Sequence, residues 1–278
     1  MVYLAGEYER LSENQVHLWL TFFDDPKVDG LQEDYRRLLT TDELAQERRF
    51  HFEADRRRYL VTRALLRCTL SRYIDVHPSA WRFATNEYGR PHIADAQGLA
   101  ARVHFNISHT HSLIAVAVSL QGPLGVDTEN VPRRPAVAHL ADHYFANAEK
   151  VDLRSLPLPQ QPLRFFEYWT LKESYIKARG MGLSIPLDRF SFDVARPGRI
   201  KLDVDPCLED DAARWTFWQW SLGTDYLLAL CAQRIGENTP SVQLWRTLPL
   251  LPPQAEDITP LRTSHPQPAS ARSSPVGS

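Results

Sequence analysis

The sequence lacks the features that mark several large classes of protein. It has three cysteines in 278 residues, and Cys68, Cys207 and Cys231 are too widely scattered for a disulfide framework or a zinc site, so we expect buried, reduced thiols. No apolar run approaches the roughly 20 residues of a membrane span. The start of the chain has neither the basic nor the apolar region of a secretory signal. These absences predict a cytoplasmic protein that does not contact a membrane.

An excess of charge is also missing. The chain has 32 Lys and Arg against 34 Asp and Glu, a formal net charge of −2. This balance predicts no bulk affinity for nucleic acid. A hydrophobic content of 43% is typical of soluble globular proteins. The length suits one large domain or two of about 100–120 residues.

One long helix is predicted from Phe165 to Gly182, a stretch without proline that ends in glycines able to stop a helix. At about 100° per residue, one face of this helix is apolar: Tyr168, Leu171, Tyr175 and Ala178. The opposite face places Glu173 and Lys177 among aromatic residues. Residues with such spacing ordinarily form a solvated helix pair. Charges in apolar surroundings, however, are usually paired, metal-bound or functional.

A strand is predicted over residues 124–130, LGVDTEN, after the apolar run 112–120. Asp127 and Glu129 are two apart in it and therefore lie on the same face of the strand. Two carboxylates on one face repel each other unless a cation neutralises them, and ligands that are all oxygen suit Mg²⁺. A D-x-E pair alone is common at solvated strand ends, so its specificity is low.

The combination of motifs is more specific than either one. G-V-D-x-E, followed about forty residues later by W-x-x-K-E-x-x-x-K, resembles the 4′-phosphopantetheinyl transferases, particularly the broad-specificity type that activates peptide synthetases such as the surfactin system. NEYGRPHI (86–93) and HFNISHTHS (104–112) resemble the two segments of that family that contact coenzyme A. GLSIPLDRFSF (182–192) resembles the segment after its helix. The resemblance runs from about residue 40 to about residue 235.

A short internal echo agrees with this family's architecture. Residues 101–105 and 113–117 resemble residues 213–217 and 227–231, as two copies of one hairpin. The resemblance implies an α+β fold of two similar halves, each a small sheet packed with helices, with the active site between them. We expect an N-terminal half over 1–121 and a C-terminal half over 122–246 that carries the metal and base motifs. The Pro/Ser-rich tail, 247–278, is predicted to be disordered.

The resemblance also implies the chemistry. The 4′-phosphopantetheine arm of coenzyme A would be transferred to a serine of an acyl or peptidyl carrier protein, giving 3′,5′-ADP. Mg²⁺, with Mn²⁺ as the alternative, would be held by Asp127, Glu129 and Glu173. Glu173 would also act as the base, and Lys177 would neutralise the bridging or leaving oxygen. The residues implied in binding the coenzyme are Arg49, Arg58, Tyr88, Gly89, Arg90, Pro91, Asn106, Ser108, His109, Lys172 and Lys177.

The arginine-rich segment 48–58 need not bind the coenzyme. It could be a solvated helix face, or an RNA-binding patch that nothing else in the chain supports. Related enzymes carry basic residues where this chain has Glu43 and Gln46, which leaves Arg49 and Arg58 as the candidates for phosphate binding.

Two other functions use part of the same pattern. A Mg²⁺-dependent nucleotide or phosphate-ester hydrolase would need the acidic trio but not the YGRP and NISH segments. A non-catalytic coenzyme A or carrier-protein binding module would have no reason to keep all three acids and Lys177. We expect a monomeric enzyme that acts on coenzyme A and a carrier protein.

Overall fold

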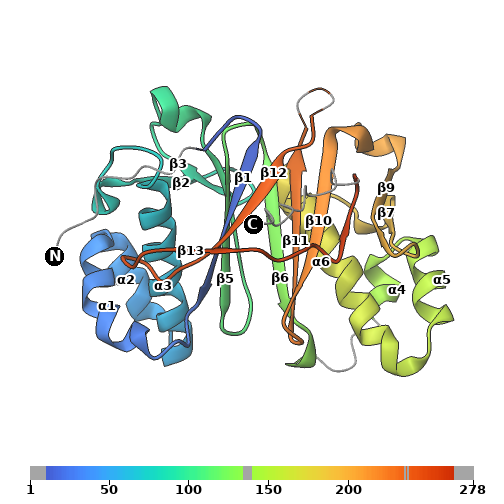
Figure 1. The fold of residues 1–278 in the computed structure, drawn as a ribbon, viewed down its shortest axis with the longest axis horizontal. Coiled ribbons are helices and arrows are strands. Elements are labelled where there is room, and N and C mark those ends of the chain that lie inside the picture. The colour runs from blue at the N-terminus through green and yellow to red at the C-terminus, as the bar shows by residue number, and fades with distance from the viewer. Residues whose placement is uncertain (1–10, 134–139, 235, 237, 266–278) are drawn as a thin grey trace, which may run out of the picture.

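The computed structural model describes residues 11–133, 140–234, 236 and 238–265, and the chain is an α+β fold of two similar halves (Figure 1). The elements of the first half are β1 (Gln15–Phe22), α1 (Lys27–Leu38), α2 (Thr41–Arg49), α3 (Glu53–Leu70), β2 (Phe83–Thr85), β3 (Pro91–Ile93), β4 (His104–His109) and β5 (Leu113–Ser119). Those that follow are β6 (Leu124–Asn130), α4 (Ala141–Tyr144), α5 (Asn147–Ser155), α6 (Gln161–Arg179), β7 (Phe190–Asp193), β8 (Gly198–Arg199), β9 (Lys201–Val204), β10 (Trp215–Leu222), β11 (Tyr226–Gln233), β12 (Ser241–Arg246), β13 (Gln254–Glu256) and β14 (Arg262–Thr263).

The two halves repeat one arrangement of elements. The first sheet has the strand order β13-β12-β1-β5-β4, and the second has the order β6-β11-β10-β14-β8. In each, a leading strand pairs antiparallel with the second strand of a later hairpin: β1 with β5, and β6 with β11. A long helix, α3 or α6, precedes that hairpin. The echo found in the sequence is therefore a structural repeat, and the predicted fold class is confirmed.

Helix α6 begins at Gln161, earlier than predicted, with Pro162 in its first turn, where the missing N–H of proline has no helical partner to lose. It ends at Gly180, whose φ of 71° is left-handed and whose N–H donates to the Ile176 carbonyl at 3.0 Å. The predicted apolar stripe is at most 1% exposed and packs against β11 and β6. Because this stripe is buried in the second core, the opposite face of α6 points away from that core.

Three apolar cores hold the molecule together. One lies between α1–α3 and the first sheet, and a second lies between α5, α6 and the second sheet. The third joins the faces of the two sheets that point away from these helices, and includes Leu18, Val126, Trp218, Trp220 and Leu230. The halves are therefore packed against each other directly, through β1, β5, β6, β10 and β11.

Strand β6 runs unusually close to α6 because residue 125 is glycine. A Cβ built at Gly125 would lie 2.0 Å from the Ser174 carbonyl oxygen and 2.4 Å from the Ala178 nitrogen, both in the backbone of α6. Any larger side chain would push strand and helix apart. The glycine of the G-V-D-x-E motif thus brings Asp127 and Glu129 next to the helix that carries Glu173 and Lys177.

The C-terminal segment differs from its prediction. Strand β12 pairs parallel with β1 in the first sheet, whereas β14 pairs with β10 in the second. The segment between them runs across the front of the molecule in Figure 1. The tail prediction was therefore wrong through His265, and β12 belongs to the first sheet rather than to the second half. The prolines of this segment lie between short strands, a placement that sheets tolerate. Residues 266–278 lie outside the described part.

Two further sequence predictions can be compared with the structure. Cys68 and Cys231 are buried, as expected, but Cys207 is exposed. Among the residues that the structure describes, no helix combines the length and the apolar character that a membrane span requires.

Candidate functional site

The candidate site lies where α6 meets β6. The Lys177 ammonium donates to Asp127 Oδ1 at 2.7 Å, to Ser108 Oγ at 3.0 Å and to the Val126 carbonyl at 3.1 Å. Asp127 is 5% exposed, so this ion pair is largely withdrawn from water. The two motifs that are about forty residues apart in the sequence therefore meet in one charged cluster, as predicted.

Ser108 links the first half of the chain to this cluster. Its hydroxyl donates to Asp127 Oδ1 at 3.0 Å and accepts from Lys177 and from the Thr128 N–H. A hydroxyl has one proton and two lone pairs, and all three are used here. Ser108 was predicted to bind the coenzyme, but in this structure its side chain faces β6 and Lys177 instead.

Glu173 is one helical turn before Lys177 on the same face of α6. Burial and the nearby negative charge of Asp127 raise the pKa of Glu173 to about 7, although Lys177 lowers it in part. A carboxyl with a pKa near neutrality can accept a proton and release it again at physiological pH. Glu173 thus has the electrostatic environment of a general base.

The carboxylates offer the oxygen donors that a divalent cation prefers. Their positions suit such a cation only in part. Asp127 Oδ2 is buried and has no hydrogen-bond partner in the described structure, which is an unfavourable state for a charged oxygen. Asp127 lies close enough to Glu173 to raise its pKa by repulsion, and Glu129, 7% exposed, is two residues further along β6. Nevertheless, no three acidic, histidine or cysteine side chains among the described residues are close enough together to bind a metal ion.

His109 and Arg58 lie near each other at the end of β4, on the side of the first half. Desolvation by the surrounding protein and the positive charge of Arg58 lower the pKa of His109, although the residue is exposed at the surface. Arg58 forms an ion pair with Asp55 at 2.9 Å, and it is about one-third exposed. Arg49 is exposed and contacts Gln46 at 3.4 Å, with no interaction that links it to His109.

Lys172 is a correction to the predicted coenzyme-binding set. Its side chain is 0% exposed, and its ammonium contacts Glu149 Oε2 at 2.8 Å and the carbonyls of Leu187 and Phe190 at 2.8 and 2.7 Å. All three protons are therefore used inside the second half. The helical position of Lys172 places it with the buried stripe rather than with Glu173.

Arg90 is a second correction, because its guanidinium was predicted to bind phosphate. It donates instead to three main-chain carbonyls, of Lys177 and Ala178 at 2.9 Å and of Leu124 at 3.1 Å. Cations near the C-terminal carbonyls of a helix are stabilising. Arg90 thereby fastens the β2–β3 turn to the ends of α6 and β6.

The rest of that turn presents a mixed surface. Asn86 donates to the Gly180 carbonyl at 3.0 Å, and its Oδ1 accepts from the Tyr88 and Arg90 amides. Gly89 has a φ of 81°, which glycine adopts without strain. Tyr88 is 46% exposed and Pro91 is half-buried, so both remain available to a ligand.

Glu43, the apparent departure from the family pattern, has a structural role. It accepts from Arg63 Nε at 2.6 Å and from Arg67 at 2.6 Å, and it completes the capping box of Thr40 at the start of α2. Glu43 thereby anchors α2 to α3. Thr110, which bonds the Asn130 amide at 3.1 Å, was missed, although its period-two spacing with Asn106 and Ser108 could have revealed it.

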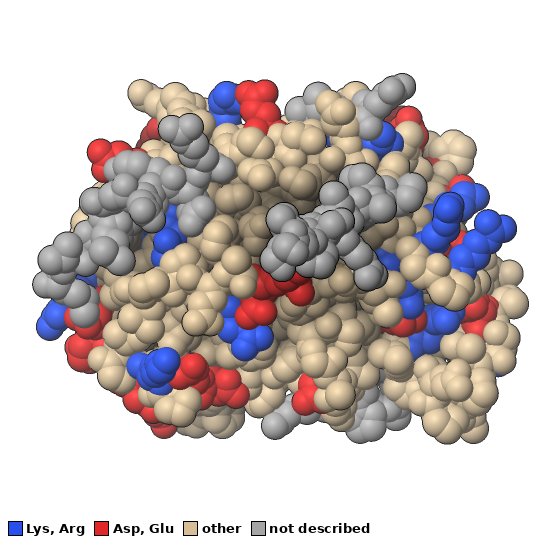
Figure 2. Space-filling view, viewed as in Figure 1, with Lys and Arg blue, Asp and Glu red and all other residues tan. Residues whose placement is uncertain are grey.

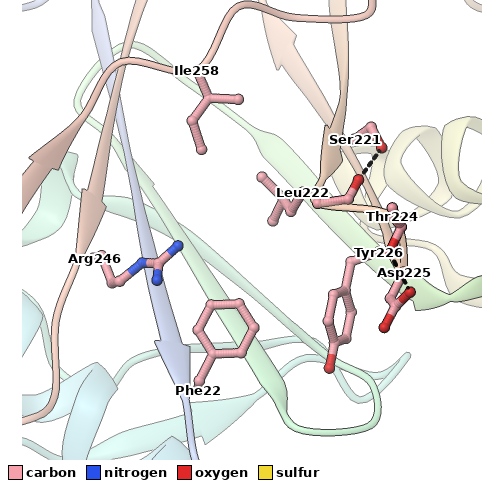
Figure 3. Close-up of a pocket in the computed structure, with 9 residues that line it drawn as sticks. Phe22, Ser221, Leu222, Thr224, Asp225, Tyr226, Arg246 and Ile258 are labelled. Carbon is pink, nitrogen blue, oxygen red and sulfur yellow. Dashed lines mark hydrogen bonds between the residues drawn. The ribbon is translucent and has the colours of Figure 1, made fainter.

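A well-formed cavity lies away from this cluster. It has a volume of about 460 Å³ and is lined by Phe22, Arg246, Ile258 and the β10–β11 turn, residues 221–226 (Figure 3). None of the lining residues belongs to the acid–lysine cluster. On the face drawn in Figure 2, acidic and basic side chains are interspersed rather than gathered by sign.

Comparison with known proteins identifies the family. The model of the 4′-phosphopantetheinyl transferase superfamily matches residues 123–231, and that of the 4′-phosphopantetheinyl transferase N-terminal region matches residues 29–121. The chain is similar to the 4′-phosphopantetheinyl transferase HetI of Nostoc sp., 36% identical over 174 residues (63% of this chain and 72% of HetI). It is also similar to the 4′-phosphopantetheinyl transferase Sfp of Bacillus subtilis, 31% identical over 211 residues (76% of this chain and 89% of Sfp). This chain therefore belongs to the 4′-phosphopantetheinyl transferase superfamily of enzymes, and within it to the Sfp-like type.

Proposed function

We propose that this protein transfers the 4′-phosphopantetheine arm of coenzyme A to a serine of an acyl or peptidyl carrier protein and releases 3′,5′-ADP. The observation that carries the proposal is the cluster of Asp127, Lys177 and Glu173. It lies at the junction of the two halves, within residues 123–231 that the superfamily model matches. Its relatives HetI and Sfp are named for the transfer reaction.

The reaction requires one proton transfer and one exchange of phosphate ester. The serine oxygen attacks the phosphorus next to the pantetheine, and the bond from that phosphorus to the oxygen of 3′,5′-ADP breaks. Glu173, whose pKa is about 7, accepts the serine proton and later passes it to solvent. Lys177 supplies positive charge close to the departing oxygen, although its three protons are already donated within the protein.

Asp127, Glu129 and Glu173 are the residues that would hold Mg²⁺, or Mn²⁺ in its place. Bound there, the ion would neutralise the pyrophosphate of the coenzyme and stabilise charge on the transferred group. Two observations support a cation at this position: Asp127 Oδ2 is buried without a hydrogen-bond partner, and the pKa of Glu173 is raised by burial and by the nearby charge of Asp127.

The proposed coenzyme site now rests on fewer residues than the sequence implied. His109 and Arg58 are the paired candidates for the 3′-phosphate, and Tyr88, Gly89 and Pro91, in the β2–β3 turn, stay candidates for the rest of the coenzyme. Arg49 remains a candidate only because of its position in the sequence. Lys172, Arg90, Asn106 and the Ser108 hydroxyl are left out because their polar groups bond to the protein.

Mass spectrometry tests the proposal directly. An apo carrier protein is incubated with this protein, coenzyme A and Mg²⁺, and a gain of one phosphopantetheine arm on the carrier is expected. A parallel reaction without Mg²⁺ should give little product. Hydrolysis of the coenzyme with no gain of mass on the carrier would favour a phosphate-ester hydrolase, and binding without either reaction would favour a non-catalytic module.

A further inference from the structure

The outer edge of β6 is the end of the second sheet, because β6 pairs with β11 on one side only. Successive amides of a strand point to opposite edges, and the Val131 amide already bonds the Asp225 carbonyl on the β11 side. The amides of Val126, Thr128 and Asn130 therefore point outward. Edge amides of this kind are normally paired or covered. The strand that lies beside them is β4, the last strand of the first sheet.

Side chains of β4 and of Thr110, the residue directly after it, bond these amides. Each of three residues accepts one hydrogen bond: Asn106 from Val126 (2.9 Å), Ser108 from Thr128 (3.3 Å) and Thr110 from Asn130 (3.1 Å). Donor and acceptor are 20 residues apart in the sequence in every case. We call Asn106, Ser108 and Thr110 the β4 comb.

The carbonyls on the same edge of β6 are also bonded by side chains. Leu124 accepts from Arg90 at 3.1 Å, and Val126 accepts from Lys177 at 3.1 Å. The edge is thus covered by polar side chains from three motifs that sequence analysis had assigned to the coenzyme or to catalysis. Hydrogen bonds at this edge join the two halves, in addition to those that Asn86 and Arg90 make to the end of α6.

We propose that Asn106 and Thr110 are positioning residues, which set the register and rotation of β6 so that Asp127 and Glu129 face Glu173. The two acids alternate along β6 with the residues that the comb fixes, so each acid has a fixed amide on both sides. Neither Asn106 nor Thr110 has a hydrogen bond to Asp127, Lys177 or Glu173 among those described. The inference rests on the proposed function, because it takes these acids as ligands of the cation.

Paired variants at Thr110 test the positioning role. Thr110→Val keeps the shape of the side chain and removes the acceptor, whereas Thr110→Ser keeps the hydroxyl. We expect Thr110→Val to weaken Mg²⁺ binding, measured by calorimetry with coenzyme A present, by about tenfold, the effect of losing an outer-shell partner. Thr110→Ser should stay close to the parent protein. Equal losses in both variants, or none in Thr110→Val, would overturn the role.

Amide hydrogen exchange tests the comb without any variant, cation or coenzyme. In the full-length protein, the outward amides of Val126, Thr128 and Asn130 should exchange as slowly as the β6 amides that bond β11. Fast exchange at these three amides, beside slow exchange at their neighbours, would overturn the comb. Slow exchange in a protein that fails to modify any carrier would leave the comb standing and would reject the proposed function instead.

Discussion

Gly125 is the residue on which the distance between β6 and α6 depends. In Gly125→Ala the added methyl group would meet helix backbone that no rotamer change can move, so we expect a loss of at least about 1–3 kcal/mol in the free energy of unfolding. Transfer activity should fall with it, because Asp127 moves with the strand. Urea denaturation and the carrier assay measure the two effects.

Gly30 provides the matched control for that substitution. It lies within α1, and a Cβ there meets nothing within 4 Å. Gly30→Ala should be neutral or should stabilise the protein by up to about 1 kcal/mol, the helix preference of alanine over glycine. If Gly125→Ala is as stable as Gly30→Ala, the close approach of β6 to α6 does not exist in solution.

The raised pKa of Glu173 predicts a dependence of stability on pH. Its ordinary pKa is 4.5 and its value in the fold is about 7, so ionisation is harder in the folded state. Without a cation, this residue should therefore lower the free energy of unfolding as pH rises from about 4.5 to 7, by about 3 kcal/mol at most. Adding Mg²⁺ should restore part of that loss.

Glu173→Gln removes this titration and the base together. The stability of the variant relative to the parent, from urea denaturation in metal-free buffer, should increase between pH 5 and pH 8. Its transfer rate should be at least ~10² lower, as expected on losing a general base. A variant that folds and turns over near the parent rate would remove Glu173 from the mechanism.

His109 is expected to bind the 3′-phosphate that coenzyme A has and dephospho-coenzyme A lacks. Loss of a hydrogen bond to a charged group costs about 1.5–3 kcal/mol, so His109→Ala should reduce kcat/KM for coenzyme A roughly ten- to hundredfold. Use of dephospho-coenzyme A should hardly change, and the two substrates should converge. His111→Ala, at an exposed position two residues further, is the control. Equal losses on both substrates would place His109 at the pyrophosphate or in the fold.

At the scale of elements, the buried pair Glu149–Lys172 fastens α5 to α6. Glu149 also accepts from the amides of Ala146 and Phe192, so it joins three segments of the second half. Removing one partner of a buried ion pair typically costs about 3–5 kcal/mol. Lys172→Met should therefore destabilise the protein strongly, as measured by thermal and urea unfolding.

The same variant distinguishes a structural lysine from one that binds the coenzyme. In Lys172→Met combined with Glu149→Gln, we expect the loss of stability to be smaller than the sum of the two single losses, because the partners are directly coupled. KM for coenzyme A in the surviving protein should stay near the parent value. A raised KM with unchanged stability would return Lys172 to the coenzyme site.

Sequence patterns predicted the elements better than the direction of individual side chains. The 3.6-residue period of α6 placed Glu173 with Lys177, and the alternation of β6 placed Asp127 with Glu129, because both elements are regular. That the two pairs face each other was implied only by the resemblance to the family. Lys172 and Arg90 were assigned to the coenzyme because a cation in a motif gives no sign of which carbonyls surround it. Those carbonyls belong to loops and ends far along the chain, and periodicity does not place them.

At the scale of the whole molecule, the C-terminal segment connects both sheets. Arg262, beside β10, forms an ion pair with Glu167 of α6 at 2.8 Å, and both side chains are at most about one-tenth exposed. Composition pointed to disorder in 247–278 because prolines and serines outnumber the few residues of β13 and β14. The pairing of β12 and β14 with distant partners carries no local signal.

Arg262→Met tests the connection to the second half. It removes a charge-assisted bond but leaves Glu167 with one ionic partner, Arg164, so we expect a loss of about 1.5–3 kcal/mol. The control is Arg189→Met, which breaks an exposed pair with Asp205 and should leave the melting temperature nearly unchanged. Thermal unfolding of the two variants side by side measures the difference. Similar melting temperatures would mean that the segment does not dock in solution.

The pairing of β12 with β1 has a consequence for the order in which the protein can form. Their contacts join residues 226 positions apart, as between Thr21 and Thr247. During synthesis on the ribosome, the first sheet therefore stays without its neighbour on that side of β1 until most of the chain has emerged. Contacts of such long sequence separation slow folding and leave strand edges open. The nascent first half, made early and completed last, is therefore the stage most exposed to aggregation.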